Sequence, residues 1–197
     1  YILAISAAKA RGCLSVEDEA KFVAELFSIP QKIKRILEDQ KIVQWLATKM
    51  AARSNIFFVG RGIDYAICLE GSLKLKEISY IHSEAYAAGE LKHGTISLIE
   101  EGTIVVGVLT QDGLEEKTIS NMVEIKSRGG YLVTVAKYGD YNIENMADCV
   151  LFVPTTESYF TASLAVVPLQ LLSYYVGVNK GVDVDKPRNL AKSVTVE

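Results

Sequence analysis

The chain has 197 residues, of which 49% are hydrophobic and 23% are charged, and its formal net charge at pH 7 is −3. This composition is ordinary for a soluble globular domain with a sizeable core, and the charge gives no support for binding nucleic acid or an anionic membrane. No run of 18 consecutive apolar residues suggests a membrane span. The three cysteines, Cys13, Cys68 and Cys149, are too far apart for a zinc motif or a disulfide framework, which suits the reducing cytoplasm.

The first fifty residues predict a helical block. Its expected helices are Tyr1–Arg11, a segment from Ser15 to about Phe27, Gln31–Leu37 after Pro30, and Lys41–Ala52. The chain opens without Met and without a basic segment before its apolar residues, so a signal peptide is not expected. We interpret residues 1–53 as a helical connector within a longer protein, in which a main domain at 54–181 and a tail at 182–197 follow.

Four short apolar runs predict the strands of the main domain. They are Ile56–Gly60, Ile104–Leu109, Tyr131–Ala136 and Cys149–Val153. Helical segments separate them, most clearly Leu114–Ser127 and Tyr159–Asn179. Strands that alternate with helices predict an α/β fold with a parallel sheet covered on both faces. Ligands of such sheets bind beyond the carboxyl ends of the strands.

The turn Gly60-Arg61-Gly62 follows the first predicted strand and precedes a helix that starts near Asp64. Glycine at this place would let a ligand approach backbone N–H groups, but a tight strand–helix turn is the more frequent reason for such glycines. The pattern is neither GxGxxG nor GxxxxGK[ST], so it does not support nucleotide binding.

Glu70, Lys74 and Glu77 fall within one sector of the helix that begins near Asp64, and isoleucines share that sector. Charges in an apolar stripe are costly unless they pair or face a cavity. Two interpretations stay open: a structural ion network, or a site in which a carboxylate of raised pKa acts as a general base.

Three further residues carry possible chemistry. His82 and His93 lie in the segment after that helix, and a loop histidine can transfer protons near neutral pH, although a surface histidine without function is as common. Lys192 lies in the tail, where a lysine becomes nucleophilic only if the tail folds over a site and excludes water. Local pattern alone does not favour that role.

Two long motifs, LEGSLKLKEISYIHSEAYAAGELKHG from Leu69 and DVDKPRNLAKSVTVE to the final Glu197, resemble the glutamine–fructose-6-phosphate aminotransferase family. The resemblance covers Asn55 to Glu197 and, less distinctly, the helical connector. It implies an SIS-type three-layer αβα sandwich, the second of two tandem sugar isomerase (SIS) domains, with the catalytic tail attached. Thr95 departs from the proline that many members carry there, which we expect to be tolerated.

The resemblance also implies the chemistry. The family converts fructose 6-phosphate and glutamine-derived ammonia to glucosamine 6-phosphate without a cofactor or metal. Lys192 matches the lysine that forms a Schiff base with the open-chain ketose, and Ala191 matches a tail position near the sugar and the ammonia channel. Glu77 matches the base that moves a proton between C1 and C2, and Lys74 matches the lysine that assists at the hydroxyls. His93 matches the ring-opening histidine, which reaches the site from the other subunit of a homodimer.

The resemblance also implies that two domains of the family's enzyme lie outside this chain. The glutaminase domain and the first SIS domain, which holds the sugar phosphate in the family, are absent, and Cys13 does not match the catalytic cysteine of the glutaminase. We therefore expect the isolated chain to be inactive. Two alternatives are a non-catalytic SIS module that senses phosphosugars and a fructosamine 6-phosphate deglycase. A sensor has no use for Glu77 and Lys192 together, and the full tail favours the aminotransferase over the deglycase.

Overall fold

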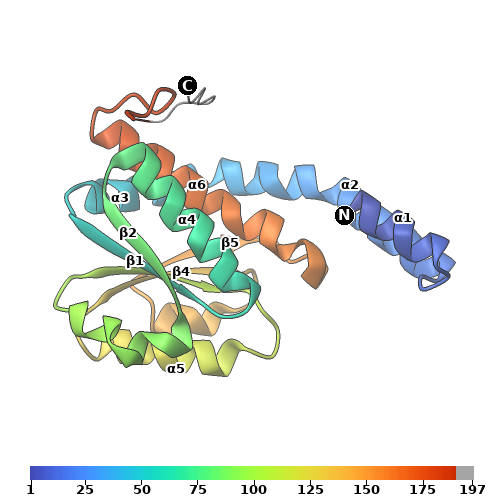
Figure 1. Ribbon diagram of the computed structural model, residues 1–197, viewed down its shortest axis with the longest axis horizontal. Coiled ribbons are helices and arrows are strands. Elements are labelled where there is room, and N and C mark those ends of the chain that lie inside the picture. Colours follow the sequence, from blue (N-terminus) through green and yellow to red (C-terminus); the bar gives the residue numbers. More distant parts are fainter. Residues whose placement is uncertain (190–197) are drawn as a thin grey trace, which may run out of the picture.

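The predicted parallel sheet is present, with five strands in the order β2-β1-β3-β4-β5 (Figure 1). The computed structural model describes residues 1–189. The strands are β1 (Asn55–Gly60), β2 (His82–Ala87), β3 (Ile104–Leu109), β4 (Tyr131–Lys137) and β5 (Cys149–Val153). Every neighbouring pair is parallel. All six residues of β3 are buried, because helices cover both faces of this central strand and only apolar side chains suit that position.

The helices connect and cover these strands. They are α1 (Ile2–Ala10), α2 (Val16–Glu38), α3 (Gln40–Ala51), α4 (Ile63–Ser79), α5 (Glu115–Lys126) and α6 (Thr161–Asn179). Short 3₁₀ segments add η1 (Ala88–His93), η2 (Thr95–Leu98), η3 (Tyr141–Asn145) and η4 (Ser158–Phe160). In the core, α3, α4 and α6 pack on one face of the sheet, whereas α5, η1 and η3 pack on the other. This is the expected three-layer α/β sandwich (Figure 1).

The polar edge strand β2 has no counterpart among the predicted strands. It pairs only with β1 and runs parallel to it. Its sequence, His-Ser-Glu-Ala-Tyr-Ala, leaves most of its side chains half-buried or exposed. An edge strand tolerates polar residues, so it lacks the continuous apolar run by which buried strands are recognised.

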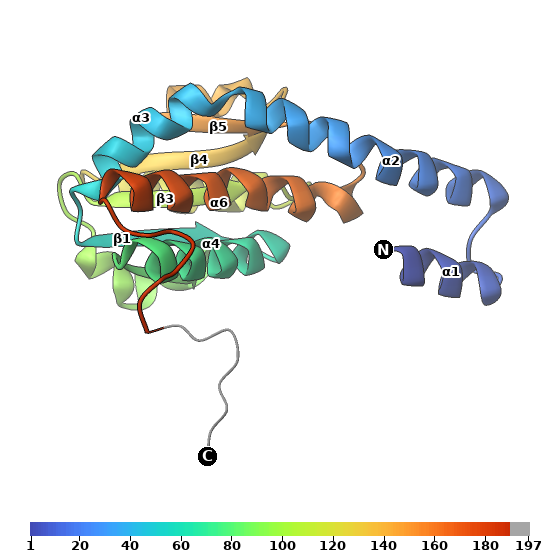
Figure 2. The same ribbon diagram turned by 90° about the horizontal axis from the view of Figure 1, so that it is seen from above.

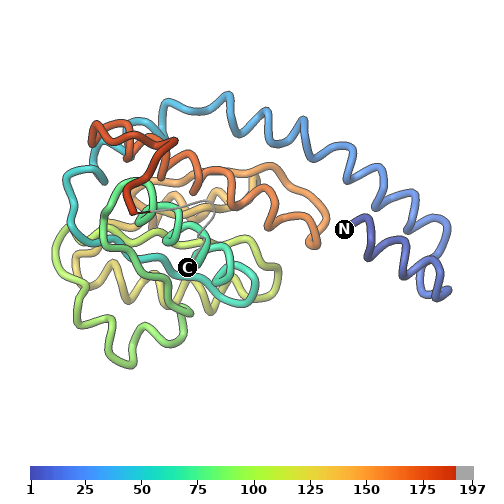
Figure 3. The backbone as a smooth tube through the Cα atoms, turned by 45° about the horizontal axis from the view of Figure 1, so that its top comes forward, coloured from blue at the N-terminus to red at the C-terminus, as the bar shows by residue number. Residues whose placement is uncertain are grey.

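Helix α2 runs without interruption from Val16 to Glu38, so the predicted break at Pro30 is wrong. Proline removes one backbone hydrogen bond and is unfavourable inside a helix. Here Ile29, Ile33 and Ile36 pack against the core on the same side of the helix, and this tertiary contact outweighs the local preference. The first part of α2 and the antiparallel α1 extend beyond the sheet (Figures 2 and 3).

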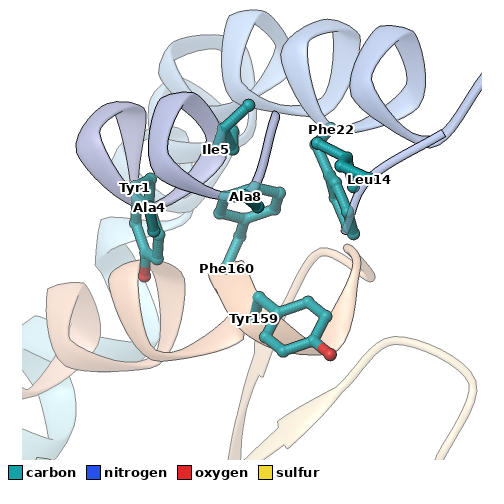
Figure 4. A pocket seen from close by; sticks show the side chains of 8 residues that line it. All are labelled: Tyr1, Ala4, Ile5, Ala8, Leu14, Phe22, Tyr159 and Phe160. Carbon is teal, nitrogen blue, oxygen red and sulfur yellow. The ribbon is translucent and has the colours of Figure 1, made fainter. Parts of the chain in front are cut away.

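An apolar pocket of about 300 Å³ lies where α1 and α2 meet the start of α6 (Figure 4). Its lining residues are Tyr1, Ala4, Ile5, Ala8, Leu14, Phe22, Tyr159 and Phe160. None of these side chains is charged, and most of them are apolar.

The residues Ser158–Asn179, which include α6, form a segment long and apolar enough by composition to cross a membrane. More than half of its most apolar window is buried inside the fold. Leu164, Leu169 and Leu172 of this helix belong to the main core, which is shared with α3 and α4. Because α6 contacts neighbours on several sides, burial in the protein accounts for its apolar character.

Candidate active site

Glu70, Lys74 and Glu77 lie away from the buried stripe of α4, which corrects the sequence interpretation. The buried residues of α4 are Asp64, Ile67, Cys68, Gly71, Ser72, Leu75 and Ser79. Glu70, Lys74 and Glu77 retain side-chain exposures of 39%, 31% and 27%. They share their side of the helix with the exposed Ile63 and Leu73. The three charged groups therefore form a surface network and are not enclosed in the core.

Within that network Lys74 and Glu77 form a close ion pair. The Nζ of Lys74 donates to Oε2 of Glu77 at 2.7 Å, while Oε1 of Glu70 is 3.9 Å from the same nitrogen. The hydrogen bond to Glu77 is the main reason that the pKa of Lys74 is raised, although partial burial opposes it. Lys74 thus stays an ammonium at neutral pH, and it holds the carboxylate of Glu77 in one orientation one turn before the end of α4.

His93 is exposed at the end of η1, directly before Gly94. η1 packs with α5 on the sheet face opposite α4. The chain therefore does not bring His93 together with Glu77. His82 is exposed at the start of β2, where its Nε2 lies 3.6 Å from Oε1 of Glu84.

The predicted site residues of the tail, Ala191 and Lys192, lie outside the described residues. The described part of the tail crosses from the end of α6 over α4 (Figure 2). Within the described residues, the backbone N–H of Arg188 donates to the hydroxyl of Tyr80, the residue that ends α4. Tyr80 follows Glu77 by three residues, so the tail approaches the Lys74–Glu77 pair from the carboxyl end of the helix.

The strand order of the sheet reverses between the carboxyl ends of β1 and β3. At this switch point, backbone N–H groups already donate hydrogen bonds to a side chain of the protein. Asp64 is 2% exposed, and its carboxylate accepts hydrogen bonds from the backbone N–H of Thr110 at 2.8 Å and of Gln111 at 3.2 Å. Its Oδ1 also accepts from the Thr110 hydroxyl at 2.5 Å. An internal carboxylate thus takes the place that an anionic ligand occupies at this edge in many parallel sheets.

The Asp64 contacts lead to a pH-dependent prediction. Burial raises the pKa of Asp64, and the hydrogen bonds from Thr110 and Gln111 oppose that rise. A raised folded-state pKa means that the folded protein holds the proton more tightly than the unfolded chain. This contribution to stability is full below the ordinary aspartate pKa and is lost as the pH rises through the folded-state pKa.

We therefore expect Asp64→Asn to lower the free energy of unfolding by about 1–3 kcal/mol at pH 7, because the amide NH₂ faces backbone donors. The difference between wild type and variant should shrink as the pH rises above the ordinary aspartate pKa of about 4, since asparagine does not titrate. Urea denaturation of wild type and variant at several pH values measures the loss in the free energy of unfolding and its dependence on pH. A difference that grows with pH would contradict this account.

Gly60 fits the tight-turn interpretation of the Gly60-Arg61-Gly62 segment. A Cβ at residue 60 would lie 2.6 Å from the carbonyl carbon of Asp64 and 2.8 Å from the backbone nitrogen of Tyr65. These are backbone atoms of the first turn of α4 and cannot move aside. We expect Gly60→Ala to destabilise the fold by about 3 kcal/mol. Ser120→Ala on the exposed side of α5 is the control, and equal denaturation midpoints for the two variants would contradict the prediction.

Two residues of this region have no chemical role in the sequence interpretation. Asp64 is visible in the sequence only as an acidic residue at a helix start, and its partners at 110 and 111 are 46 and 47 residues away. Tyr80 gives no signal, because a helix that ends in a left-handed residue usually has glycine there. Among residues 1–189, no cluster of three or more histidine, cysteine or acidic side chains has the arrangement of a metal site.

Comparisons with known proteins agree with the fold and with the motifs. Over its whole length the chain is 54% identical to a glutamine–fructose-6-phosphate aminotransferase (isomerizing) of Clostridium tetani and 51% identical to one of Caldanaerobacter subterraneus subsp. tengcongensis. The chain spans 32% of the length of each of these relatives. These identities confirm the resemblance to the aminotransferase family that the two motifs indicate.

A solved structure of the C-terminal domain of glucosamine-fructose-6-phosphate aminotransferase from Francisella tularensis is 35% identical and superposes with a TM-score of 0.86, over 94% of this chain and 52% of that one. The model of the SIS domain matches residues 49–180. The finer division at 53 and 181 stays a prediction. The SIS domain model covers most of the chain, and the chain has the parallel five-stranded sheet with helices on both faces. The chain therefore belongs to the SIS domain family.

Proposed function

We propose that the full-length protein containing this chain is a glutamine–fructose-6-phosphate aminotransferase (isomerizing). It would form glucosamine 6-phosphate and water from fructose 6-phosphate and ammonia released from glutamine. The observation that carries the proposal is the similarity over the entire chain, at 51% and 54% identity, to two relatives that bear this name.

The proposed chemistry begins at Lys192. Its amine attacks C2 of the open-chain ketose and expels water, which leaves an imine; ammonia then replaces the lysine, which leaves as the free amine. Glu77 removes a proton from C1 and the proton is delivered to C2, while the proton of the C1 hydroxyl passes to the nitrogen. The C2 imine thus becomes an amine, and C1 becomes the aldehyde carbon. Ala191 would line the site beside the sugar and the path of ammonia.

The ion pair on α4 supports the assignment of Glu77 and Lys74. The 2.7 Å hydrogen bond holds the carboxylate in one orientation, and the ammonium of Lys74 can stabilise negative charge on a sugar oxygen beside it. Side-chain exposures of 27% and 31% leave both groups accessible to a substrate. A proton-transfer base must be both positioned and accessible, and this pair meets both conditions.

Further parts of the site would come from outside this chain. We propose that the missing two thirds of the protein include the glutaminase domain and the first SIS domain, and that the latter holds the sugar phosphate. His93 would act in ring opening at the site of a second copy in a homodimer. Its separation from Glu77 across the sheet supports a role at another copy's site. The expected compartment is the cytoplasm, and we expect no cofactor.

The test is a direct assay of the purified full-length protein. With fructose 6-phosphate and glutamine, we expect glucosamine 6-phosphate and glutamate in equal amounts. Binding of sugar phosphates without turnover would instead favour a sensor. Release of fructose 6-phosphate from fructosamine 6-phosphate, with no glutamine-dependent synthesis, would favour a deglycase.

A further inference from the structure

Three segments that are distant in the chain meet at the guanidinium of Arg61, which lies in the turn between β1 and α4. Its Nη2 donates to Oδ1 of Asn121 of α5 at 2.7 Å, and Asn121 is 6% exposed. A Cβ on Gly89 of η1 would lie 3.0 Å from the same Nη2 and 3.3 Å from Nη1. The arginine thus joins the turn after β1 to both α5 and η1.

Glycine at residue 89 is explained by this contact and not by its backbone. Gly89 has no positive φ, so a residue with a side chain could adopt its conformation. A methyl group there would instead press on the guanidinium of Arg61, which the hydrogen bond to Asn121 holds in place. Gly89 and Arg61 therefore fit each other, and the fit depends on the flat shape of the guanidinium.

Arg61 makes these contacts at a cost in stability. Its Nε is buried and has no hydrogen-bond partner among residues 1–189. A buried donor without a partner destabilises the folded state. The benefit that offsets this cost must lie at the far end of the side chain, where the guanidinium contacts α5 and η1.

The contact at Gly89 holds η1 on a side that its core contacts do not reach. A 3₁₀ segment has three residues per turn, so Ala88 and Leu91 share one side of η1 and His93 lies on another. Ala88 and Leu91 are fully buried, whereas His93 is exposed. A segment held only by two side chains in one line can rotate about its own axis, and the guanidinium at Gly89 blocks that rotation. The direction of the His93 side chain therefore depends on Arg61.

We propose that Arg61 is a positioning residue, which clamps η1 against α5 and so directs His93 toward the sugar ring at the site of a second copy. This inference rests on the proposed function. Ring opening breaks the bond between C2 and the ring oxygen: the C2 hydroxyl gives up a proton, the ring oxygen takes one up, and C2 becomes a ketone carbon. An imidazole transfers these protons only when it is aimed at the two oxygens. Arg61 acts on this step only through η1.

The test compares two ketose phosphates as substrates of the full-length protein. Fructose 6-phosphate is mostly cyclic, whereas 5-deoxyfructose 6-phosphate lacks the hydroxyl that closes the ring and stays an open-chain ketone. Each is supplied with glutamine, and kcat/KM for amino sugar formation is measured. A residue that acts through His93 should affect only the substrate whose ring must open, whereas a residue that only supports the fold should affect both substrates equally.

Four variants are compared with wild type. Arg61→Gln removes the guanidinium, Gly89→Ala presses a methyl group against it, and His93→Ala removes the imidazole. Arg128→Gln is the control, because this arginine after the end of α5 is exposed and its Nη1 donates to the carbonyl of Glu124 at 2.8 Å. A second measurement needs no substrate: the rate at which the backbone amides of η1 exchange hydrogen for deuterium, read from the mass of the peptide that contains them.

For Arg61→Gln we expect kcat/KM for fructose 6-phosphate to fall by about tenfold, while that for 5-deoxyfructose 6-phosphate stays within about twofold of wild type. Gly89→Ala should change the ratio of the two values in the same direction, and His93→Ala should change it further. Amide exchange in η1 should accelerate by about tenfold in Arg61→Gln and stay at the wild-type rate in Arg128→Gln. Equal losses on both substrates in Arg61→Gln and Gly89→Ala would overturn the proposal, because the role would then be structural. Wild-type amide exchange in Arg61→Gln would also overturn it.

Failure of the proposed function gives a different result. If the wild-type protein forms no amino sugar from fructose 6-phosphate, the proposed function and the positioning role both fall. If wild type is active and His93→Ala slows both substrates equally, the ring-opening role of His93 falls, and the role of Arg61 falls with it. If His93→Ala distinguishes the two substrates and Arg61→Gln does not, only the role of Arg61 falls. Amide exchange reports directly on the clamp, even where the open-chain analogue is a poor substrate.

Discussion

Glu77→Gln is expected to lower the rate of glucosamine 6-phosphate formation by about 10²–10⁴-fold, the usual contribution of a general base. The amide oxygen of glutamine can still accept the hydrogen bond that Lys74 donates at 2.7 Å to the carboxylate, so the local geometry should be retained and only basicity is lost. Under the proposed function, glutamine is hydrolysed in a separate domain outside this chain, so its hydrolysis should stay measurable in the same preparation. Separate assays of the amino sugar and of released glutamate detect the two effects.

Glu70→Gln is the matched control for this substitution. Glu70 lies on the same helix and its Oε1 is 3.9 Å from the same Lys74 nitrogen, but no role in proton transfer is assigned to it. We expect the rate of glucosamine 6-phosphate formation in Glu70→Gln to stay within about threefold of the wild-type rate, since exposed ion pairs contribute little. Near-normal synthesis in Glu77→Gln, or an equal loss in both variants, would show that the base has been assigned to the wrong residue.

Lys192→Ala is expected to abolish covalent trapping of fructose 6-phosphate by borohydride. Reduction of an imine fixes the sugar phosphate to the lysine, and alanine has no amine with which to form that bond. Lys192→Arg should fail in the same way, because guanidinium keeps the positive charge and does not form the imine. The mass of the intact protein after reduction, followed by mapping of the modified peptide, measures the result.

Lys186→Ala is the corresponding control in the same tail. Lys186 lies six residues before Lys192, and its contact within the tail uses its backbone N–H, which alanine retains. Trapping should therefore equal that of wild type. If Lys192→Ala still became labelled, the imine would have to form at another lysine, and the modified peptide would identify it.

The sequence predicted an element correctly where burial constrains every residue of that element, and it failed where packing between elements decides. The runs at β1, β3, β4 and β5 were recognisable because strands buried on both faces must be apolar throughout. The polar edge strand β2 was not, since an edge is under no such constraint. Pro30 suggested a helix end, but the packing of α2 on the core outweighs that local preference. Periodicity assigned the charges of α4 to its apolar stripe, whereas the contacts with α6 and the sheet select the other side for burial.

The sequence by itself determined the fold class and, through two long motifs, the family and its candidate residues, because strand periodicity and motif identity are local properties of the chain. Only the tertiary structure revealed three arrangements. These are the pairing of Asp64 with the loop after β3, the position of His93 on the face opposite Glu77, and the contact of Tyr80 with Arg188. Each of these arrangements brings together residues that are far apart in the chain, or keeps apart residues that are close in it. A local sequence pattern carries no information about such distances in space. Burial, hydrogen bonding and packing between elements decide them.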